Sequence, residues 1–391
     1  MTNHFEKYVY IDTKIVGAIH QTVQYFKSGI FGNDVCILIK KYRVSSVRIS
    51  QILKKNKINY YWIRNNRQLD ALNSGVVFYL FNAQSNCRLV SNRKLIHIFV
   101  THGESNKAAS TKPIIRLYDF ISVAGQAGID RYLNAGIFSP FDIKSNRLIK
   151  MGDTFTGRIE KFNTSKENGK WLFYAPTWEG GIEKENYSSL YIDNIIQKIL
   201  EITKSNNING IAIQAHPNIG HRSFTAILKL AKIITAFLKA DIKIQMIEPK
   251  GKVGKISLIF QTNSKFKIIK RDQLPNISLA ITDISAMEIQ CIASKIPVAM
   301  TMTSAHYSDI TSAEIKSHYD KCWLKDNKSI NKFEFWQKNI GYKNFIRNYY
   351  IGYECDDLEN MSMTKRINWL INFANENLHT ARFLSSTQNP S

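Results

Sequence analysis

The sequence is short of clustered cysteines, of acidic residues and of long hydrophobic runs. Its five cysteines stand singly, without a C-x-x-C pair or a Cys/His cluster at metal-ligand spacing, which argues against structural zinc and a disulfide framework. No apolar run approaches the roughly 20 residues that span a bilayer. The first residues, MTNHFEKYVYID, contain no apolar signal core. We therefore expect a cytoplasmic protein with reduced thiols and no metal site.

Basic residues are in large excess over acidic ones. The chain has 53 Lys and Arg against 31 Asp and Glu, a formal net charge of +22, which implies an anionic partner such as nucleic acid, anionic lipid or a phosphorylated substrate. The basic residues are spread between apolar segments, and no nucleic-acid-binding module is recognisable. We expect no nucleic acid partner, although a nucleic-acid-binding protein is the alternative from a different functional class.

Short apolar runs recur along most of the chain, as expected for strands. In the first part they lie at 8–12, 35–39, 59–63, 75–81 and 95–100. In the second part they lie at 171–176, 210–217, 242–247 and 277–283. Between them are segments with helical spacing, at 44–57, 188–204 and 224–239.

Alternating strands and helices predict parallel sheets that helices cover on both faces. Two such series predict an α/β protein with two doubly wound, Rossmann-like domains. We expect the first domain at 1–160 and the second at 161–375, the second ending in aromatic-rich helices, with a tail at 376–391.

The apolar run at 95–100 ends in Thr101, His102 and Gly103. Because ligands bind at the carboxyl ends of parallel strands, His102 would lie at the ligand-binding edge of the sheet. A histidine that only satisfies backbone groups of the turn explains the pattern equally well.

Three other apolar runs end in polar residues of the same kind, at Pro176-Thr177, His216-Pro217 and Thr282-Asp283. Such junctions gather at one edge of an α/β sheet, and together they predict a ligand-binding cleft. Pro217 ends its strand and would leave His216 exposed at the tip. A buried, hydrogen-bonded His216 is the alternative.

Ser285 and Glu288 form the S-x-x-E pattern of a helix capping box. The same helix start presents free N–H groups and the positive end of the helix dipole, which also bind phosphate. Ser285 is therefore a candidate phosphate ligand as well as a cap. For Glu288, capping and the binding of a ligand hydroxyl both stay open.

These four segments, in this order, resemble the CDP-glycerol glycerophosphotransferase family, which includes teichoic-acid primases and polymerases and related capsule polymerases. The matching residues lie between about 95 and 300 and are His102-Gly103 with Lys107, Tyr174–Trp178, His216-Pro217, Thr282–Ala286 with Glu288, and Ile296–Val298. Two positions depart from the family pattern. Glu179 stands where the family usually has Arg, and Ala286 stands where it has a second Ser.

The resemblance implies a GT-B fold, with two Rossmann-like domains facing each other across a cleft and the donor held mainly by the second. It implies that an acceptor hydroxyl attacks a CDP-polyol and that CMP leaves. His102 would be the base, and His216 would stabilise the charge on the phosphates. The donor-binding residues would be Gly103, Lys107, Thr177, Pro217, Thr282, Asp283, Ser285 and Glu288.

The implied partners are a CDP-polyol and an anionic polymer or lipid-linked acceptor at the inner face of the membrane, to which the basic segment 44–57 would be drawn. No cofactor is required, and the sequence does not indicate Mg²⁺. The alternative among enzymes is a GT-B glycosyltransferase that uses a nucleotide sugar in cell-surface polysaccharide synthesis.

Overall fold

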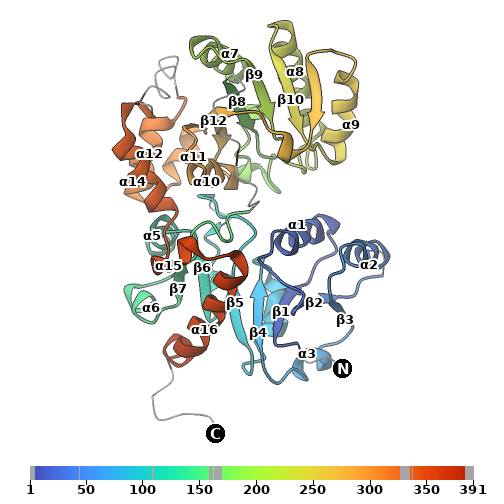
Figure 1. Cartoon of the computed structure of the whole chain (residues 1–391), viewed down its shortest axis with the longest axis vertical. Coiled ribbons are helices and arrows are strands. Elements are labelled where there is room, and N and C mark those ends of the chain that lie inside the picture. Colours follow the sequence, from blue (N-terminus) through green and yellow to red (C-terminus); the bar gives the residue numbers. More distant parts are fainter. Residues whose placement is uncertain are drawn as a thin grey trace. The chain divides into compact units, whose positions relative to one another are not determined.

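The chain forms two compact units, each with its own parallel sheet (Figure 1). The computed structural model describes residues 5–43, 45–107, 110–157, 162, 170–325, 335–336 and 338–383. The first unit comprises Met1–Glu104, Thr111–Ile159 and Tyr350–Ser391, and the second comprises Ser105–Ser110 and Glu160–Tyr349. The predicted α/β class with two Rossmann-like sheets is confirmed.

The sheet of the first unit has seven parallel strands in the order β3-β2-β1-β4-β5-β6-β7. They are β1 (Lys7–Ile11), β2 (Val35–Lys40), β3 (Tyr60–Ile63), β4 (Val76–Tyr79), β5 (Ile96–Phe99), β6 (Phe120–Val123) and β7 (Leu148–Lys150). The strand order reverses between β1 and β4, and the crevice beside such a reversal is where doubly wound sheets bind ligands.

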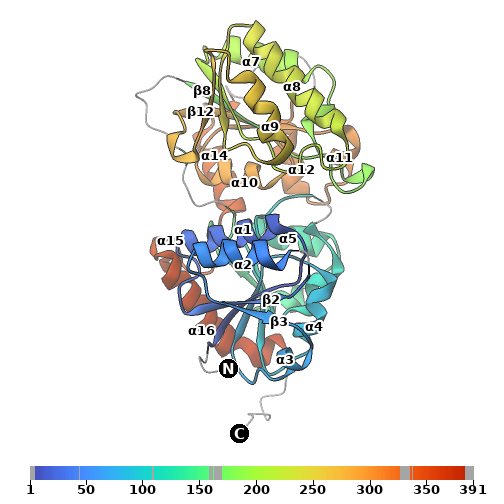
Figure 2. The same cartoon turned by 90° about the vertical axis from the view of Figure 1, so that its right-hand side faces the viewer.

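Successive side chains of each strand point to opposite faces of the sheet and pack in two apolar clusters of the first unit. Val9 and Ile11 of β1 pack in one cluster, and Tyr8 and Tyr10 pack in the other. Residues of α1 (Val16–Lys27), α2 (Ser46–Lys55) and α16 (Met363–Ala381) join the first cluster, and residues of α5 (Gln126–Asn134) join the second. Figure 2 shows α1 and α2 lying over the sheet. The short helices of this unit are α3 (Arg67–Asp70), α4 (Cys87–Val90), α6 (Pro140–Lys144) and α15 (Asp357–Asn360).

The sheet of the second unit has six parallel strands in the order β11-β10-β9-β8-β12-β13. They are β8 (Trp171–Ala175), β9 (Gly210–Ile213), β10 (Lys243–Ile247), β11 (Phe266–Ile269), β12 (Ile277–Asp283) and β13 (Val298–Thr301). Here the order reverses between β8 and β12, where Ala175 pairs with Thr282.

Seven helices are described for this part of the chain: α7 (Ile195–Ser205), α8 (Phe224–Lys239), α9 (Gly251–Phe260), α10 (Ala286–Ala293), α11 (Ser304–Ser308), α12 (Ala313–Cys322) and α14 (Ile340–Tyr350). The apolar positions of α7 and α8 recur at helical spacing and form one core cluster with β8, β9 and β10. None of the helices in the described ranges has both the length and the apolar composition needed to cross a bilayer.

The C-terminal segment from Tyr350 packs in the first unit, whereas we expected residues up to 375 in the second domain and a tail from 376. The expectation has to be corrected, because Leu370 and Ala374 of α16 are buried in the core of the first unit. The helix extends to Ala381, so residues 376–381 are not a tail; residues 384–391 lie outside the described ranges.

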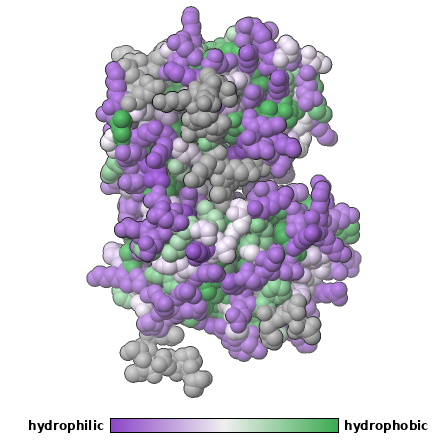
Figure 3. Space-filling model, in the orientation of Figure 1, coloured by the Kyte–Doolittle hydropathy of each residue, from purple (hydrophilic) through white to green (hydrophobic). Residues whose placement is uncertain are grey.

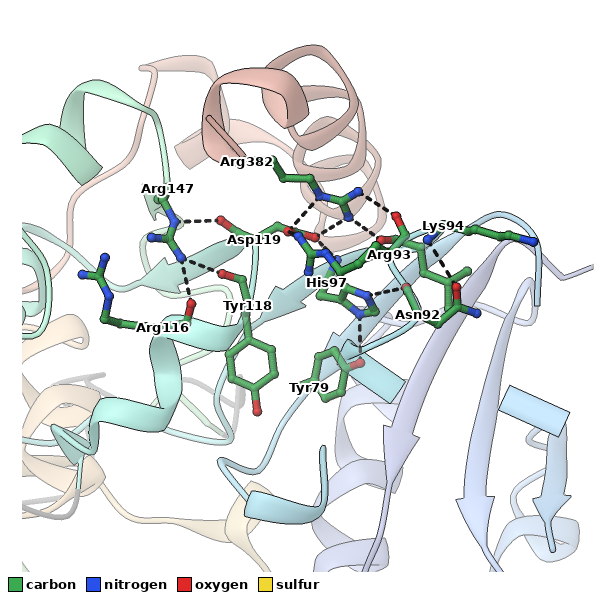
Figure 4. Close-up of polar contacts among 11 residues, drawn as sticks. Tyr79, Asn92, Arg93, Lys94, His97, Arg116, Tyr118, Asp119, Arg147 and Arg382 are labelled. Atoms are coloured by element: carbon green, nitrogen blue, oxygen red, sulfur yellow. Dashed lines mark hydrogen bonds and ion pairs between the residues drawn. The ribbon is translucent and has the colours of Figure 1, made fainter. Parts of the chain in front are cut away.

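Arginines at the two ends of α16 fix the helix to the first unit. Near its start, Arg366 donates hydrogen bonds to Asp153 and Thr154. At its end, Arg382 donates to both carboxylate oxygens of Asp119, at 3.0 and 2.8 Å (Figure 4). Sequence spacing carries no sign of these pairs, since more than 200 residues separate the partners.

Candidate functional site

The point where the strand order of the second sheet reverses is organised by Asp283. This side chain is 0% exposed at the end of β12. It accepts hydrogen bonds from the backbone N–H groups of Thr177 and Ser189, at 2.6 and 3.1 Å, and from the Thr301 hydroxyl at 2.5 Å. Burial raises the pKa of Asp283 to about 6, although these hydrogen bonds oppose the rise. Asp283 therefore positions Thr177 by accepting its backbone N–H. Direct contact between Asp283 and the nucleotide donor stays a prediction.

Lys107 reaches the same edge of the second sheet, because residues 105–110 belong to the second unit. Its Nζ donates a hydrogen bond to Thr177 Oγ1 at 3.0 Å and lies 5.4 Å from the centroid of the Tyr187 ring. Desolvation lowers the pKa of Lys107 to about 8, against the opposing effect of the Asp283 and Glu185 carboxylates. Lys107 is therefore mostly protonated at neutral pH and brings a positive charge to Thr177.

Asn106, the neighbour of Lys107, anchors this segment within the second unit. Its side-chain N–H donates to the Tyr319 hydroxyl at 2.9 Å, and that hydroxyl donates to Glu288 at 3.0 Å. Glu288 is 0% exposed. Its carboxylate is therefore the final acceptor in a buried series of hydrogen bonds from Asn106 through Tyr319. The capping pattern in the sequence did not predict these contacts.

The other residues predicted around the start of α10 lie in different surroundings. Ser285 is confirmed as the N-cap of α10, and its hydroxyl accepts from the Met287 N–H at 3.3 Å. Thr282 is 0% exposed, with its hydroxyl 3.3 Å from Met300 Sδ, inside the sheet. Of these two, only Ser285 stands at the helix start where backbone N–H groups point outward.

His216 is half-buried in the loop after β9, and its ring orientation is fixed. Its Nδ1 accepts a hydrogen bond from the Asn218 N–H at 3.1 Å, so the neutral ring carries its proton on Nε2. The ring stacks on Trp178, with centroids 5.9 Å apart and an interplanar angle of 16°. His216 can thus donate a hydrogen bond from Nε2. Pro217 beside it is exposed.

Glu179, which departs from the family pattern, holds the loop at 216–223. Its carboxylate is 0% exposed and accepts from the N–H groups of Gly220, Arg222 and Ser223, at 3.1, 2.8 and 3.0 Å. Burial alone would raise the pKa of Glu179, but the hydrogen bonds outweigh it and lower the pKa. The acidic residue therefore has a positioning role that an arginine, which has no acceptor, could not perform.

In the first unit, His102 stands at the carboxyl end of β5 with a fixed tautomer. Its Nδ1 lies 2.9 Å from the Leu80 carbonyl, which can only accept, so Nδ1 carries the proton and Nε2 keeps its lone pair. The ring packs 4.8 Å from Phe81. The residue is exposed, yet desolvation by the groups packed around its ring lowers the pKa of His102. A neutral imidazole with an unprotonated Nε2 has the state that a general base needs.

The backbone around His102 is strained. Thr101 has φ +59°, a left-handed conformation that β-branched residues rarely adopt, and Gly103 has φ +134°. Such strain clusters at functional sites because the surrounding structure has to maintain it. Here Glu104 supports the turn, accepting from the Ala124 N–H at 2.5 Å and from Arg131 at 2.8 Å.

Sequence analysis missed Ser189, Tyr187, Tyr319 and the role of Glu179. Trp178 is the last residue of the motif Tyr174–Trp178, and Glu179 follows it directly. Their position next to Thr177 was the sequence feature that could have marked them as part of the site. Tyr319 lies 213 residues from Asn106 and no local pattern connects them. In the described part of the chain, no group of three or more His, Cys, Asp or Glu side chains is arranged to hold a metal ion.

No protein-family profile matches the chain, and neither does any curated protein sequence. Among solved structures, the chain is similar to UDP-GlcNAc 2-epimerase from Neisseria meningitidis bound to UDP-GlcNAc, with 12% identity, a TM-score of 0.50, and coverage of 95% of this chain and 100% of the other. It is more distantly similar to MurG from Acinetobacter baumannii, with 9% identity, a TM-score of 0.46, and coverage of 95% and 99%.

At such identities the likeness is one of fold. The two parallel sheets, each with a reversal in strand order, and the similarity over nearly the whole chain give this protein a GT-B-like α/β architecture.

Proposed function

We propose that this protein is a transferase that moves a polyol phosphate from a CDP-polyol to an acceptor hydroxyl and releases CMP. The observation that carries the proposal is the pair of opposite histidine tautomers. His102 presents an unprotonated Nε2, suited to accept a proton, and His216 presents Nε2–H, suited to donate a hydrogen bond. The choice of reaction is supported by the ordered motifs, which resemble those of the CDP-glycerol glycerophosphotransferases.

In the proposed step, the acceptor hydroxyl passes its proton to Nε2 of His102 while its oxygen bonds to the phosphorus of the polyol phosphate. The bond from that phosphorus to the bridging pyrophosphate oxygen breaks, and CMP leaves with the electron pair. Negative charge grows on the leaving phosphate. In the second unit, the Lys107 ammonium, His216 Nε2–H and the N–H groups at the start of α10 are the donors available to stabilise it.

The roles of the buried carboxylates follow from electrostatics. A free carboxylate beside a pyrophosphate would repel it. The carboxylate oxygens of Asp283 and Glu179 instead accept hydrogen bonds from backbone N–H and hydroxyl groups of the protein. We infer that they shape the donor site, while the Lys107 ammonium, which Thr177 holds by a hydrogen bond, supplies positive charge to the ligand.

A glycosyltransferase that uses a nucleotide sugar is the second candidate. It is favoured by the fold likeness to the epimerase solved with UDP-GlcNAc. The same His102 would then deprotonate an acceptor during formation of a glycosidic bond, and the released product would be a nucleoside diphosphate.

CMP release from CDP-glycerol and CDP-ribitol, measured with glycerol-phosphate or capsule-type acceptors, tests the proposal. We expect His102→Gln to lower turnover by about 10²- to 10⁴-fold, and His379→Gln, an exposed histidine on α16, to leave it unchanged. Release of UDP from UDP-GlcNAc with no CMP from either CDP-polyol would replace the proposal by glycosyl transfer.

The pH profile of the same assay tests Lys107. If the protonated ammonium is needed, activity should fall as the pH rises through about 8, where Lys107 loses its proton. Lys107→Arg keeps the charge and should remove this alkaline limb. An unchanged limb in that variant would exclude Lys107 as its source.

A further inference from the structure

The outer faces of α8 and α9 carry large apolar side chains that the core does not use. Phe224 and Leu228 of α8 are 60% and 54% exposed, and Leu258 and Ile259 of α9 are 58% and 65% exposed. They are four of the twelve exposed large hydrophobic side chains in the described residues. The buried side of α8 is already filled by residues such as Ile227 and Leu230. The two helices are neighbours in the second unit, and exposed apolar side chains on adjacent helices indicate an interaction surface.

The charged residues on the same two helices are all basic. The helices contain five lysines and no Asp or Glu: Lys229, Lys232, Lys239, Lys252 and Lys255. All five are exposed. Figure 3 shows hydrophilic and hydrophobic side chains intermixed on the part of the surface over α8 and α9. We call these lysines and the four apolar residues the α8–α9 surface.

A groove adjoins the α8–α9 surface between α7 and α8. Its volume is about 500 Å³, and Ile196 and Leu200 of α7 contribute to an apolar lining. Lys229 and Lys232 line its α8 side, and Lys229 Nζ lies 4.5 Å from the centroid of the Tyr191 ring. Two acidic residues, Asp193 and Glu201, also line the groove, so the positive charge is concentrated on α8 and α9.

We infer that the α8–α9 surface docks on a lipid bilayer that contains anionic lipids. A helix that lies in the membrane interface combines Phe and Leu, which enter the acyl boundary, with Lys, which contacts anionic head groups. The α8–α9 surface has both, and its lack of acidic groups complements the negative bilayer. An RNA or DNA partner would use the lysines but would leave the apolar residues without a role.

The position of α8 gives the docking a consequence for the site. The helix begins at Phe224, directly after the loop at 216–223 that contains His216 and is held by Glu179. Phe224 and Leu228 lie in the first turns of α8. Docking would therefore bring that loop close to the head groups, where a lipid-linked acceptor would be present.

The basic helix α2 provides a matched comparison within the same chain. It has exposed Arg48, Lys54 and Lys55, like α8, but Val47 is its only exposed large hydrophobic residue. Charge alone therefore predicts weak, salt-sensitive attraction for α2. Charge together with apolar insertion predicts firmer binding for the α8–α9 surface.

Co-sedimentation of the full chain with vesicles, without substrate, tests the inference independently of the proposed reaction. The vesicles are phosphatidylcholine alone or with one-third phosphatidylglycerol, at 150 mM salt. We expect binding to the anionic vesicles only. The double variants Phe224→Ser with Leu228→Ser, and Lys229→Gln with Lys232→Gln, should each weaken binding about tenfold or more. The α2 variant Lys54→Gln with Lys55→Gln should change it about twofold or less.

Three results would overturn the inference. The first is binding by both α8 variants at the parental level while their circular dichroism spectra match the parent. The second is a loss confined to the α2 variant, which would place the membrane contact on the first unit. The third is a parental dimer, seen by light scattering, that the Phe224→Ser and Leu228→Ser changes dissociate, which would assign the surface to a second copy.

Discussion

The two units bury carboxylates with different partners. In the first unit, Glu104 pairs with Arg131, and Asp119 pairs with Arg93 and Arg382. In the second unit, the carboxylates of Asp283 and Glu179 are held by backbone N–H groups and hydroxyls at the carboxyl edge of the sheet.

The difference appears in the pKa values. The pKa of Asp119 is lowered, because its arginines and the His97 N–H outweigh the effect of burial. The pKa of Asp283 is raised to about 6, because its neutral donors do not compensate for burial. Neutral donors do outweigh burial at Glu179, whose pKa is lowered, so the contrast in pKa is one between Asp119 and Asp283. Arginine pairs fix α16 to the first unit, whereas Lys107 of the second unit donates a hydrogen bond to the Thr177 hydroxyl and not to the Asp283 carboxylate.

The largest expected effect comes from removing Asp283. Asp283→Ala leaves two buried N–H groups and the Thr301 hydroxyl without this acceptor, and we expect the free energy of unfolding to fall by about 3 kcal/mol or more. The measurement is urea unfolding at pH 7. Asp309→Ala, at an exposed position after α11, is the control and should stay within about 0.5 kcal/mol of the parent.

The pH dependence sharpens this test. Since the folded pKa of Asp283 lies above its ordinary value, the part of its stabilisation that depends on the bound proton is present below about pH 4 and is lost as the pH rises through about 6, whereas the hydrogen bonds that the carboxylate accepts remain at pH 7. Asp283→Asn should remove this part of the slope. An unchanged slope would mean that Asp283 is ionised throughout and that the two units do not differ in this way.

A smaller effect is expected at His97 in the first unit. The neutral ring lies between the Tyr79 hydroxyl, 2.9 Å from Nδ1, and the Asn92 carbonyl, 3.0 Å from Nε2 (Figure 4). Burial lowers its pKa to about 4. The stability that the neutral ring contributes is therefore present above about pH 6.5 and is lost as the pH falls to 4, by up to about 3 kcal/mol.

Unfolding curves for the parent and His97→Gln between pH 7 and 4.5 measure this contribution. The parent should lose more stability than the variant as the pH falls. Equal losses would show that His97 is not the titrating group. His379→Gln, the exposed histidine of α16, should follow the parent.

The smallest effect on stability is expected at Glu179. Glu179→Gln keeps one acceptor oxygen but places an N–H₂ group among the loop donors, and we expect a loss of about 1–3 kcal/mol. The donor KM should rise more than kcat falls, because the loop at 216–223 would lose its fixed shape. A variant with the parental stability and KM would contradict the positioning role.

The ends of the strands were the part of the fold that the sequence predicted best. The runs before His102, Thr177 and Asp283 were identified as strands because buried parallel strands are continuously apolar and end in polar turns. The helix expected at 224–239 is α8 to the residue. The helix expected from 188 begins at Ile195, because Ser189–Tyr191 forms a separate 3-10 turn.

The assignment of the C-terminal segment was wrong because it depends on partners distant in sequence. Local pattern predicts a helical segment at 363–378, but not that Arg382 pairs with Asp119, 263 residues earlier. The same holds for Glu288. Its spacing from Ser285 left capping and ligand binding open, and neither alternative included the hydrogen bond that it accepts from Tyr319.

By itself, the sequence determined most of the strands, the helices α2, α8 and α10 and part of α7, and the residues that stand at strand ends, because periodicity and turn chemistry act over a few neighbours. The strands β6, β7 and β11 and most of the other helices were not expected. Only the tertiary structure decided which of those residues are buried and which hydrogen bonds each of them makes. That choice depends on the acceptors and donors that the strand order brings together. Leu80 fixes the tautomer of His102, Asn218 fixes that of His216, and Thr177 takes up one oxygen of Asp283.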